Sequence, residues 1–186
     1  MKVESEKLAL LLRGAVIMAL IVLSAVLRIV PHPWNLTPVG AMALFSGAMF
    51  RNRRIALLLP LASLFAGDVF VGFHKLMLIV YASFAISVAI GRWLAEKRSA
   101  ARIGGAVFLG AAQFFVVTNF ATWAVGGFYP KTAAGLMSCF VAGVPYFWNT
   151  LVGDALYACV LFGGFALAEK MLPTMRLESA ATTRAN

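Results

Sequence analysis

The stretch IALLLPLASLFAGDVFVGFHKLMLIVYASFAISVAIGRW, residues 55–93, decides the fold class. It contains two apolar runs, at about 55–73 and 76–95, separated by a short segment that carries His74 and Lys75. Each run is close to the roughly 20 residues that an α-helix needs to cross a bilayer. The stretch therefore predicts two membrane-spanning helices joined by a tight connection.

The composition of the whole chain extends this prediction. Of its 186 residues, 62% are hydrophobic and 12% are charged, whereas soluble domains are about half apolar and a quarter charged. Further apolar runs lie at about 8–28, 38–50, 104–125 and 144–168. We therefore expect an all-α membrane protein with six transmembrane helices in a single domain, residues 1–172, and a disordered tail, residues 173–186. The short second span is expected to be tilted or only partly inserted.

The positive charges predict the orientation of these spans. The net charge is +9, and if the spans alternate, one side of the membrane receives only Arg28, Lys75 and Lys131 of the 16 Lys and Arg. Cytoplasmic loops carry the excess of Lys and Arg. Both termini are therefore expected on the cytoplasmic side of a bacterial cytoplasmic membrane. The basic charge then reflects topology, and nucleic-acid binding is not expected. No signal-peptide cleavage pattern follows the first span, which we expect to be retained.

Two acidic residues, Asp68 and Asp154, lie inside the predicted spans. Ionisable groups are costly in hydrocarbon and usually mark function there. Asp68 follows Arg54 by 14 residues, which is ~21 Å along a helix that rises 1.5 Å per residue, so it is expected near the outer side. For both carboxylates a structural role, bonded to a neighbouring helix, stands beside a role in binding a substrate.

The polar and aromatic residues of the outer loops and helix ends are expected to converge on one pocket. The last span is predicted to open near Pro145, with residues 136–139 in the loop before it. A pocket with apolar walls and a few placed polar groups is typical of a small-molecule site. The residues expected to line it are His32, Trp34, Asn35, Asp68, His74, Tyr81, Asn119, Trp123, Tyr129, Tyr146 and Asn149.

The first outer loop, VPHPWNLTP at residues 30–38, contains three prolines. Each proline fixes its φ angle and removes a backbone donor, so the loop is stiff and cannot be helical throughout. A stiff loop holds His32, Trp34 and Asn35 in place at little ordering cost on binding. The alternative is a simple connector in which Trp34 anchors the chain at the membrane interface.

Common enzyme and metal patterns are absent from the sequence. It contains no GxSxG, HExxH, P-loop or GxGxxG motif, so we expect neither an enzyme nor an ATPase of its own. Cys139 and Cys159 lie in apolar surroundings without metal-ligand spacing, and both are expected to be small buried residues. No intrinsic cofactor is expected. An intramembrane hydrolase using Asp68 and Asp154 remains an alternative, although the string LVGDAL lacks the first glycine of the GxGD pattern.

The first span carries Ala15 and Ala19 in an A-x-x-x-A pattern, continued by Val22 and Val26. Small residues four apart let helices approach closely in lipid. Such spacing also arises by chance in an alanine-rich helix.

Four long strings carry a family resemblance. They resemble a family of uncharacterised bacterial membrane proteins, similar to the substrate-binding S-components of energy-coupling-factor (ECF) vitamin transporters and to the BtuM-type proteins associated with vitamin B12. The resemblance covers about residues 8–170. The strings are PHPWNLTPVGAMALFSGA (31–48), LPLASLFAGDVFVGFH (59–74), TNFATWAVGGFYPKTAAGL (118–136) and VPYFWNTLVGDALY (144–157).

The resemblance implies a vitamin-like ligand taken up from the outer side. Cobalamin or another corrinoid is the favoured ligand, and a different small vitamin or metabolite is the alternative. Ala15 and Ala19 would contact a partner T-subunit driven by two ATPases, although solitary relatives work without one. In some BtuM-type proteins a cysteine near the outer start of the fourth span meets the corrin cobalt. Residues 76–81, LMLIVY, contain none, so His32 or His74 would be the ligand to the cobalt.

Overall fold

The computed structural model describes residues 2–27, 33 and 35–172, and within these residues every regular element is a helix. The predicted all-α fold class is confirmed. His32, Trp34 and the predicted tail lie outside the described residues. The elements are α1 (Lys2–Leu27), α2 (Val39–Met49), α3 (Arg53–Val71), α4 (Met77–Trp93), α5 (Ala100–Val125), α6 (Ala133–Ala158), the π-helical segment η1 (Cys159–Gly163) and α7 (Gly164–Met171).

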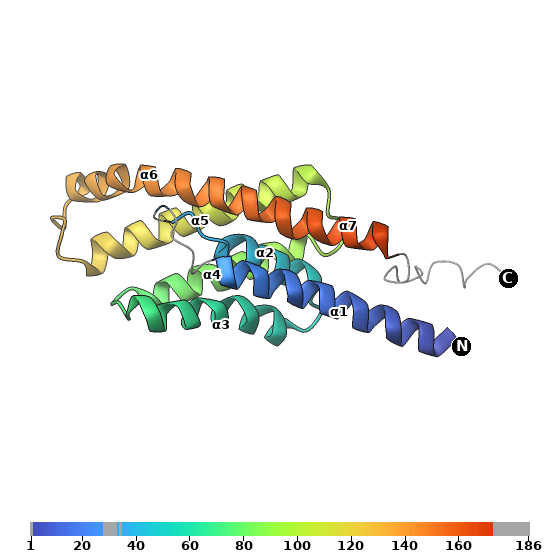
Figure 1. Cartoon of the computed structure of the whole chain (residues 1–186). Coiled ribbons are helices and arrows are strands. Elements are labelled where there is room, and N and C mark those ends of the chain that lie inside the picture. Colours follow the sequence, from blue (N-terminus) through green and yellow to red (C-terminus); the bar gives the residue numbers. More distant parts are fainter. Residues whose placement is uncertain (1, 28–32, 34, 173–186) are drawn as a thin grey trace.

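The helices run back and forth along one long axis (Figure 1). The start of α1 and the end of α7 lie at the same end of the bundle, together with the α2–α3 and α4–α5 connections. The α3–α4 and α5–α6 connections lie at the opposite end. The chain therefore alternates between the two ends of the bundle, as the prediction from the positive charges assumes.

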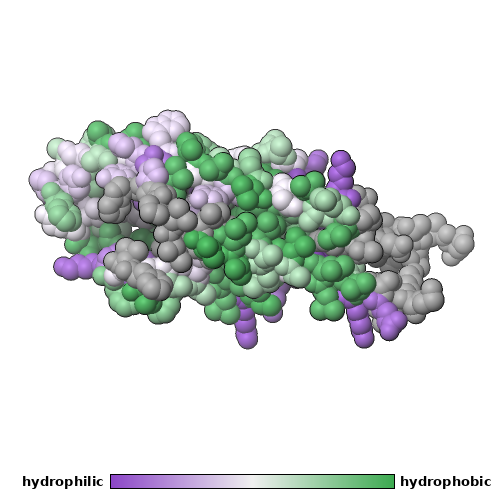
Figure 2. All heavy atoms as spheres, viewed as in Figure 1, coloured by the Kyte–Doolittle hydropathy of each residue, from purple (hydrophilic) through white to green (hydrophobic). Residues whose placement is uncertain are grey.

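Two helical stretches among the described residues are long and apolar enough to cross a membrane: α5, with 26 residues, and the continuous stretch Ala133–Met171, with 39 residues. The outer surface of the bundle is also apolar. Phe108, Val116 and Phe120 on α5 are each more than half exposed, and Figure 2 shows hydrophobic side chains across the middle of one face. Exposed apolar areas of this kind are rare on soluble monomers.

Helix α2, the shortest of the predicted spans, lies at the centre of the bundle. Residues 39–48 are all buried, and α2 contacts α1, α3, α4, α5 and α6. Its 11 residues extend only ~16 Å, about half of a bilayer core. The predicted helix over residues 38–50 is confirmed by the bounds of α2. Its apolar residues lie on all sides of the helix, which is the pattern expected where protein surrounds a helix.

Two glycines allow α2 and α4 to cross with their backbones in contact. A Cβ atom on Gly47 would overlap the carbonyl oxygen of Val88, and one on Gly91 would overlap the carbonyl of Leu44. Small residues at helix crossings permit this close approach in membrane proteins. The crossing holds α2 against α4, and α4 also carries part of the cavity wall described below.

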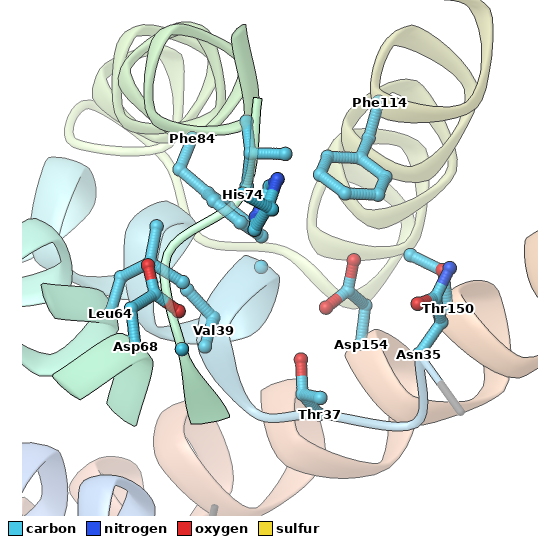
Figure 3. Close-up of a pocket in the computed structure, with 13 residues that line it drawn as sticks. Asn35, Thr37, Val39, Leu64, Asp68, His74, Phe84, Phe114, Thr150 and Asp154 are labelled. Carbon is cyan, nitrogen blue, oxygen red and sulfur yellow. The ribbon is translucent and has the colours of Figure 1, made fainter. Parts of the chain in front are cut away.

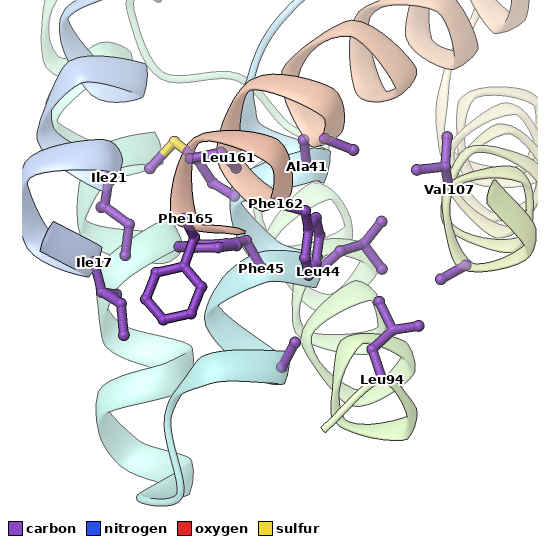
Figure 4. Packing of buried hydrophobic residues seen from close by; sticks show 14 residues of the cluster. Ile17, Ile21, Ala41, Leu44, Phe45, Leu94, Val107, Leu161, Phe162 and Phe165 are labelled. Carbon is purple, nitrogen blue, oxygen red and sulfur yellow. The ribbon is translucent and has the colours of Figure 1, made fainter. Parts of the chain in front are cut away.

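The main hydrophobic core joins α2 to the last helix and to α1 (Figure 4). The ring of Phe45 lies 5.1 Å from that of Phe162 and 6.1 Å from that of Phe165, both edge to face. Ile17 and Ile21 of α1 complete this core. The π-helical segment η1 includes Phe162 and ends just before the turn of Phe165, and such segments change which side chains share a face.

The predicted start of the last span is wrong. The helix was expected over residues 144–168, but α6 begins at Ala133 and passes through Pro145 without ending. Thr132 caps it, because its side-chain oxygen accepts a hydrogen bond from the Gly135 N–H at 3.1 Å. Proline inside a helix removes one hydrogen bond, and this loss is tolerated in a long, well-capped helix.

Both cysteines lie in the last helical stretch, and the earlier start of α6 changes the predicted place of Cys139. Residues 136–139, expected in a loop, lie in the first turns of α6. Cys139 is buried, as expected, and its Sγ donates to the Asn119 carbonyl at 3.4 Å. Cys159 is exposed, so the prediction that both cysteines are buried is wrong for this residue.

A partly buried ion pair holds α1 to the end of the bundle. Arg13 Nη1 lies 2.7 Å from Glu169 Oε1, and the Arg13 guanidinium lies 4.9 Å from the centroid of the Phe165 ring. We expect Arg13→Ala to lower the free energy of unfolding by about 1 kcal/mol, because it loses both contacts. Equilibrium unfolding in mixed detergent micelles measures this change. An equal loss in the exposed control Arg53→Ala would contradict it.

Candidate functional site

A cavity of about 520 Å³ lies among the helices (Figure 3). The loop before α2, the start of α2, the α3–α4 connection and helices α3, α4, α5 and α6 all contribute to its wall. Its lining residues are Asn35, Thr37, Val39, Gly40, Leu64, Asp68, Gly72, His74, Val80, Phe84, Phe114, Thr150 and Asp154.

One wall of the cavity is a loop that packs against the middle of α6. The Leu36 N–H donates to the Pro33 carbonyl at 3.0 Å and closes a turn. Asn35 has φ +64°, in the left-handed region that asparagine tolerates better than most residues. Gly153 of α6 lets the loop approach, since a Cβ atom there would lie 3.2 Å from the Leu36 Cα. The turn and this contact place Asn35 and Thr37 at the cavity.

Asp154 reaches from α6 to the first turn of α2. Its side chain is only 3% exposed, and Oδ1 accepts a hydrogen bond from the Ala41 N–H at 3.0 Å. The N-cap residue of α2 is Pro38, which provides no side-chain acceptor, so Asp154 supplies one from another helix. A carboxylate also interacts favourably with the positive end of the helix dipole.

Gly40 makes room for this carboxylate. A Cβ atom on Gly40 would overlap Oδ1, Oδ2 and Cγ of Asp154. Of the two carboxylate oxygens, Oδ2 receives no hydrogen bond from the part of the chain that the structure describes. Asp154 also lines the cavity.

Asp68 brings a second carboxylate from α3. It is 6% exposed, and its Oδ2 accepts a hydrogen bond from the Tyr81 hydroxyl at 2.8 Å. The chain then leaves α3 at Gly72, whose N–H donates to the Asp68 carbonyl at 2.8 Å and whose φ is +103°. Glycine is suited to this conformation. The turn leads to His74, which is exposed and lines the cavity.

The remaining wall is apolar and partly aromatic. Phe84 of α4 and Phe114 of α5 have ring centroids 5.1 Å apart. Val39, Leu64 and Val80 extend this surface. A largely apolar wall with a few polar groups is the usual composition of a ligand pocket.

The structure brings together some of the residues predicted for the site. Asn35, Asp68 and His74 line the cavity. Tyr81 does not line it, but its hydroxyl holds the Asp68 carboxylate. These four residues therefore belong to one site, although they come from three separate segments of the chain.

The predicted residues of the α5–α6 hairpin do not line this cavity. The Asn119 side chain donates to the Phe115 carbonyl at 2.8 Å, and Trp123 Nε1 donates to the Pro130 carbonyl at 2.9 Å. These two bonds keep both side chains within their own hairpin. The other predicted residues of this hairpin, likewise outside the lining, are Tyr129, Tyr146 and Asn149.

Sequence reasoning missed most of the apolar wall and underrated Asp154. Thr150 and Asp154 are four residues apart and share a helix face, which is a signal that the sequence contains. Phe84 and Phe114 sit in apolar runs like any other core residue, so no pattern distinguishes them. The remaining missed lining residues are Thr37, Val39, Gly40, Leu64, Gly72 and Val80.

The described residues contain no group of three or more His, Cys, Asp and Glu placed to hold a metal ion. Asp68, His74 and Asp154 share the cavity without forming such a group. The polar groups that these three residues bring to the cavity wall are two carboxyl groups and an imidazole.

A comparison with protein families matches residues 9–175 to the family of unknown function DUF6580. The chain belongs to DUF6580. No curated protein and no solved structure matches it. All residues that line the cavity fall within the part that matches DUF6580.

Proposed function

We propose that this DUF6580 protein is an integral membrane solute-binding protein of the ECF S-component type, which takes up a vitamin-like ligand from the outer side of the bacterial cytoplasmic membrane. The observation that supports this is a cavity of about 520 Å³ with two nearly buried carboxylates in a helical chain whose exterior is apolar. Ionisable residues inside membrane bundles usually mark substrate or ion sites.

The proposed topology has six membrane segments, with α6, η1 and α7 counted as one. The short second segment, α2, is enclosed by the others and is inserted over only part of the bilayer. Both termini are cytoplasmic in this proposal. Its support is the excess of basic residues in and beside the α2–α3 and α4–α5 connections, which lie at the same end of the bundle as the start of α1 (Figure 1). Cytoplasmic segments carry such an excess. The α3–α4 connection, with His74 at the cavity, would then face outward.

The size of the cavity favours a small ligand. Cavities of about 300–1,000 Å³ bury most of a drug-sized molecule, and the volume here, about 520 Å³, falls in that range. A corrinoid is much larger, so only part of it would enter. This supports a small vitamin or metabolite over cobalamin. In the corrinoid alternative, the exposed His74 at the cavity would be the ligand to the cobalt.

The arrangement of the carboxylates favours a carrier over a hydrolase. Aspartyl hydrolases need two carboxylates about 3 Å apart that share a proton. Here each carboxylate accepts from a donor of its own: Asp68 accepts from the Tyr81 hydroxyl of α4, and Asp154 accepts from the Ala41 N–H of α2. We therefore propose that the ligand is bound and released without chemical change.

We also propose a partner surface on α1. Ile17 and Ile21 of α1 are buried in the bundle, whereas Ala15 and Ala19 face away from it and are exposed. The exposed small residues suit the close approach of another membrane helix. An ECF T-subunit with its ATPases would be that partner, and the lipid bilayer would cover the face when it is absent.

The test of the proposed function is to identify what the protein carries. We expect protein purified in mild detergent from cells grown with cobalamin to contain a small molecule in near-equal amount, detected by mass spectrometry. Asp68→Asn should reduce its occupancy about tenfold, because the variant loses a buried charge partner. The control Glu96→Gln removes an exposed carboxylate in the α4–α5 connection and should retain the ligand.

The visible spectrum of the same preparation separates the ligand alternatives. Corrinoid absorption that is lost in His74→Ala would support cobalamin. A colourless protein with a bound small molecule would support the smaller ligand. A protein that contains nothing and is not stabilised by any added vitamin or metabolite would contradict the proposed function.

A further inference from the structure

We infer that the ligand of this cavity carries a positively charged nitrogen, as a protonated organic amine does. The inference rests on the proposed function and specifies the ligand class. The ionisable residues that line the cavity are Asp68, Asp154 and His74, and its described wall contains no Lys or Arg. The chain as a whole has a net charge of +9, so the acidic lining of the cavity is opposite in sign to the charge of the whole molecule.

Asp154 provides the strongest argument. It is 3% exposed, and its partner among the described residues is one neutral donor, the Ala41 N–H on Oδ1. A buried charge is costly unless it is paired and hydrogen-bonded. A cationic N–H group placed at Oδ2 would provide the missing opposite charge, and charge-assisted hydrogen bonds are about twice as strong as neutral ones.

Thr150 supports the same ligand group from the adjacent turn of α6. Its hydroxyl donates to the Tyr146 carbonyl at 2.9 Å. The hydroxyl proton is therefore engaged, and the oxygen is left to accept a hydrogen bond. Thr150 and Asp154 are four residues apart and both line the cavity. Together they present two acceptors to a ligand that must donate.

The carboxylate of Asp68 adds a second negative group on another wall. Its Oδ2 accepts from Tyr81, so this carboxylate is held in a defined position. Figure 3 shows Asp68 and Asp154 reaching the cavity from α3 and α6. This arrangement suits a cation between them or a ligand with donors at two ends.

The aromatic wall distinguishes an organic cation from a metal ion. Phe84 and Phe114 pack against each other at 5.1 Å and both line the cavity. Aromatic faces attract organic ammonium groups and provide an apolar surface for the rest of the molecule. A bare metal ion would need more ligands, and the described residues lack a group of three His, Cys, Asp or Glu.

The test uses matched ligands that differ only in charge. Three series are built on phenyl, indolyl and cyclohexyl groups, each with an ethylamine, an ethanol and an acetate side chain. Thermal unfolding of the purified full-length protein in detergent is measured with each compound. We expect the ethylamines to raise the melting temperature and the alcohols and acetates to have little effect.

Two variants connect the effect to the cavity. Asp154→Asn removes the charge and keeps an oxygen that can accept from Ala41. Asp68→Asn leaves the contact between Asp154 and α2 unchanged, so it serves as the test if Asp154→Asn does not fold. We expect each to weaken amine binding about tenfold or more. The control Glu96→Gln removes a carboxylate as well, but an exposed one, and it should bind the amines as the unaltered protein does.

The outcomes separate this inference from the proposed function. Stabilisation by alcohols or acetates as large as that by amines would overturn the amine inference and leave a solute-binding protein. Amine binding that is unchanged in both aspartate variants would overturn it as well. If no compound of any charge stabilises the protein and no small molecule co-purifies with it, both are overturned.

Discussion

Replacing Gly91 with alanine is expected to lower the free energy of unfolding by about 1–3 kcal/mol, because the new methyl group must enter a fully packed crossing. A Cβ atom there would overlap the Leu44 carbonyl of α2. Backbone atoms cannot move aside as a flexible side chain can, so α2 and α4 must separate. Gly47→Ala should have a similar effect, through the Val88 carbonyl.

Gly14→Ala is the matched control for this prediction. Gly14 also lies in a helix, but no atom lies within 4 Å of its added Cβ. Alanine there should be neutral or should stabilise the helix by up to about 1 kcal/mol. Equilibrium unfolding in mixed detergent micelles compares the variants. If Gly91→Ala were as stable as Gly14→Ala, the close crossing of α2 and α4 would not exist in the protein.

Gly40→Ala and Asp154→Ala are each expected to be strongly destabilising. The double variant is expected to lose less stability than the sum of the two single losses. Gly40→Ala forces a methyl group into the Asp154 carboxylate, at a cost of about 1–3 kcal/mol. Asp154→Ala leaves the buried Ala41 N–H without its acceptor, at a cost of about 1–3 kcal/mol. In the double variant the carboxylate is gone, so the methyl group of Ala at position 40 has space.

A double-mutant cycle measures this coupling. Residues in contact usually show interaction energies of about 0.5–3 kcal/mol, whereas distant sites are additive. We expect the double variant to be more stable than the sum of the two single changes predicts, by about 1 kcal/mol or more. Pairing Gly40→Ala with Arg13→Ala, a contact in another part of the bundle, provides an additive reference. Additivity of Gly40→Ala and Asp154→Ala would show that the Asp154 carboxylate does not lie against Gly40.

Most helices could be predicted from the sequence. The expected runs at 38–50, 55–73, 76–95 and 104–125 correspond to α2, α3, α4 and α5, with small shifts at the ends. Long apolar segments between polar connections are a strong local signal, because a buried or lipid-facing backbone must satisfy its own hydrogen bonds. The predicted start of the last span, near Pro145, was wrong because α6 continues through this proline and begins after the Thr132 cap.

The site was predictable only in part. Asp68 and His74 lie close together in sequence, at the end of one span, so their shared place at the cavity follows from the helix end alone. The predicted residues of the α5–α6 hairpin do not line the cavity, because the hairpin helices are longer than expected and bond among themselves. Local patterns cannot show how far one hairpin extends past its neighbours.

The helical class, the alternation of the chain between two ends and the presence of two carboxylates within apolar helices could all be predicted from the order of the residues. These follow from composition and spacing, which act over one or two helical turns. The contact between Asp154 and Ala41, 113 residues apart, could not be predicted in this way, and neither could the space that Gly40 leaves for the carboxylate. Such a contact depends on how whole helices pack, and packing is a property of surfaces that lie far apart in the chain.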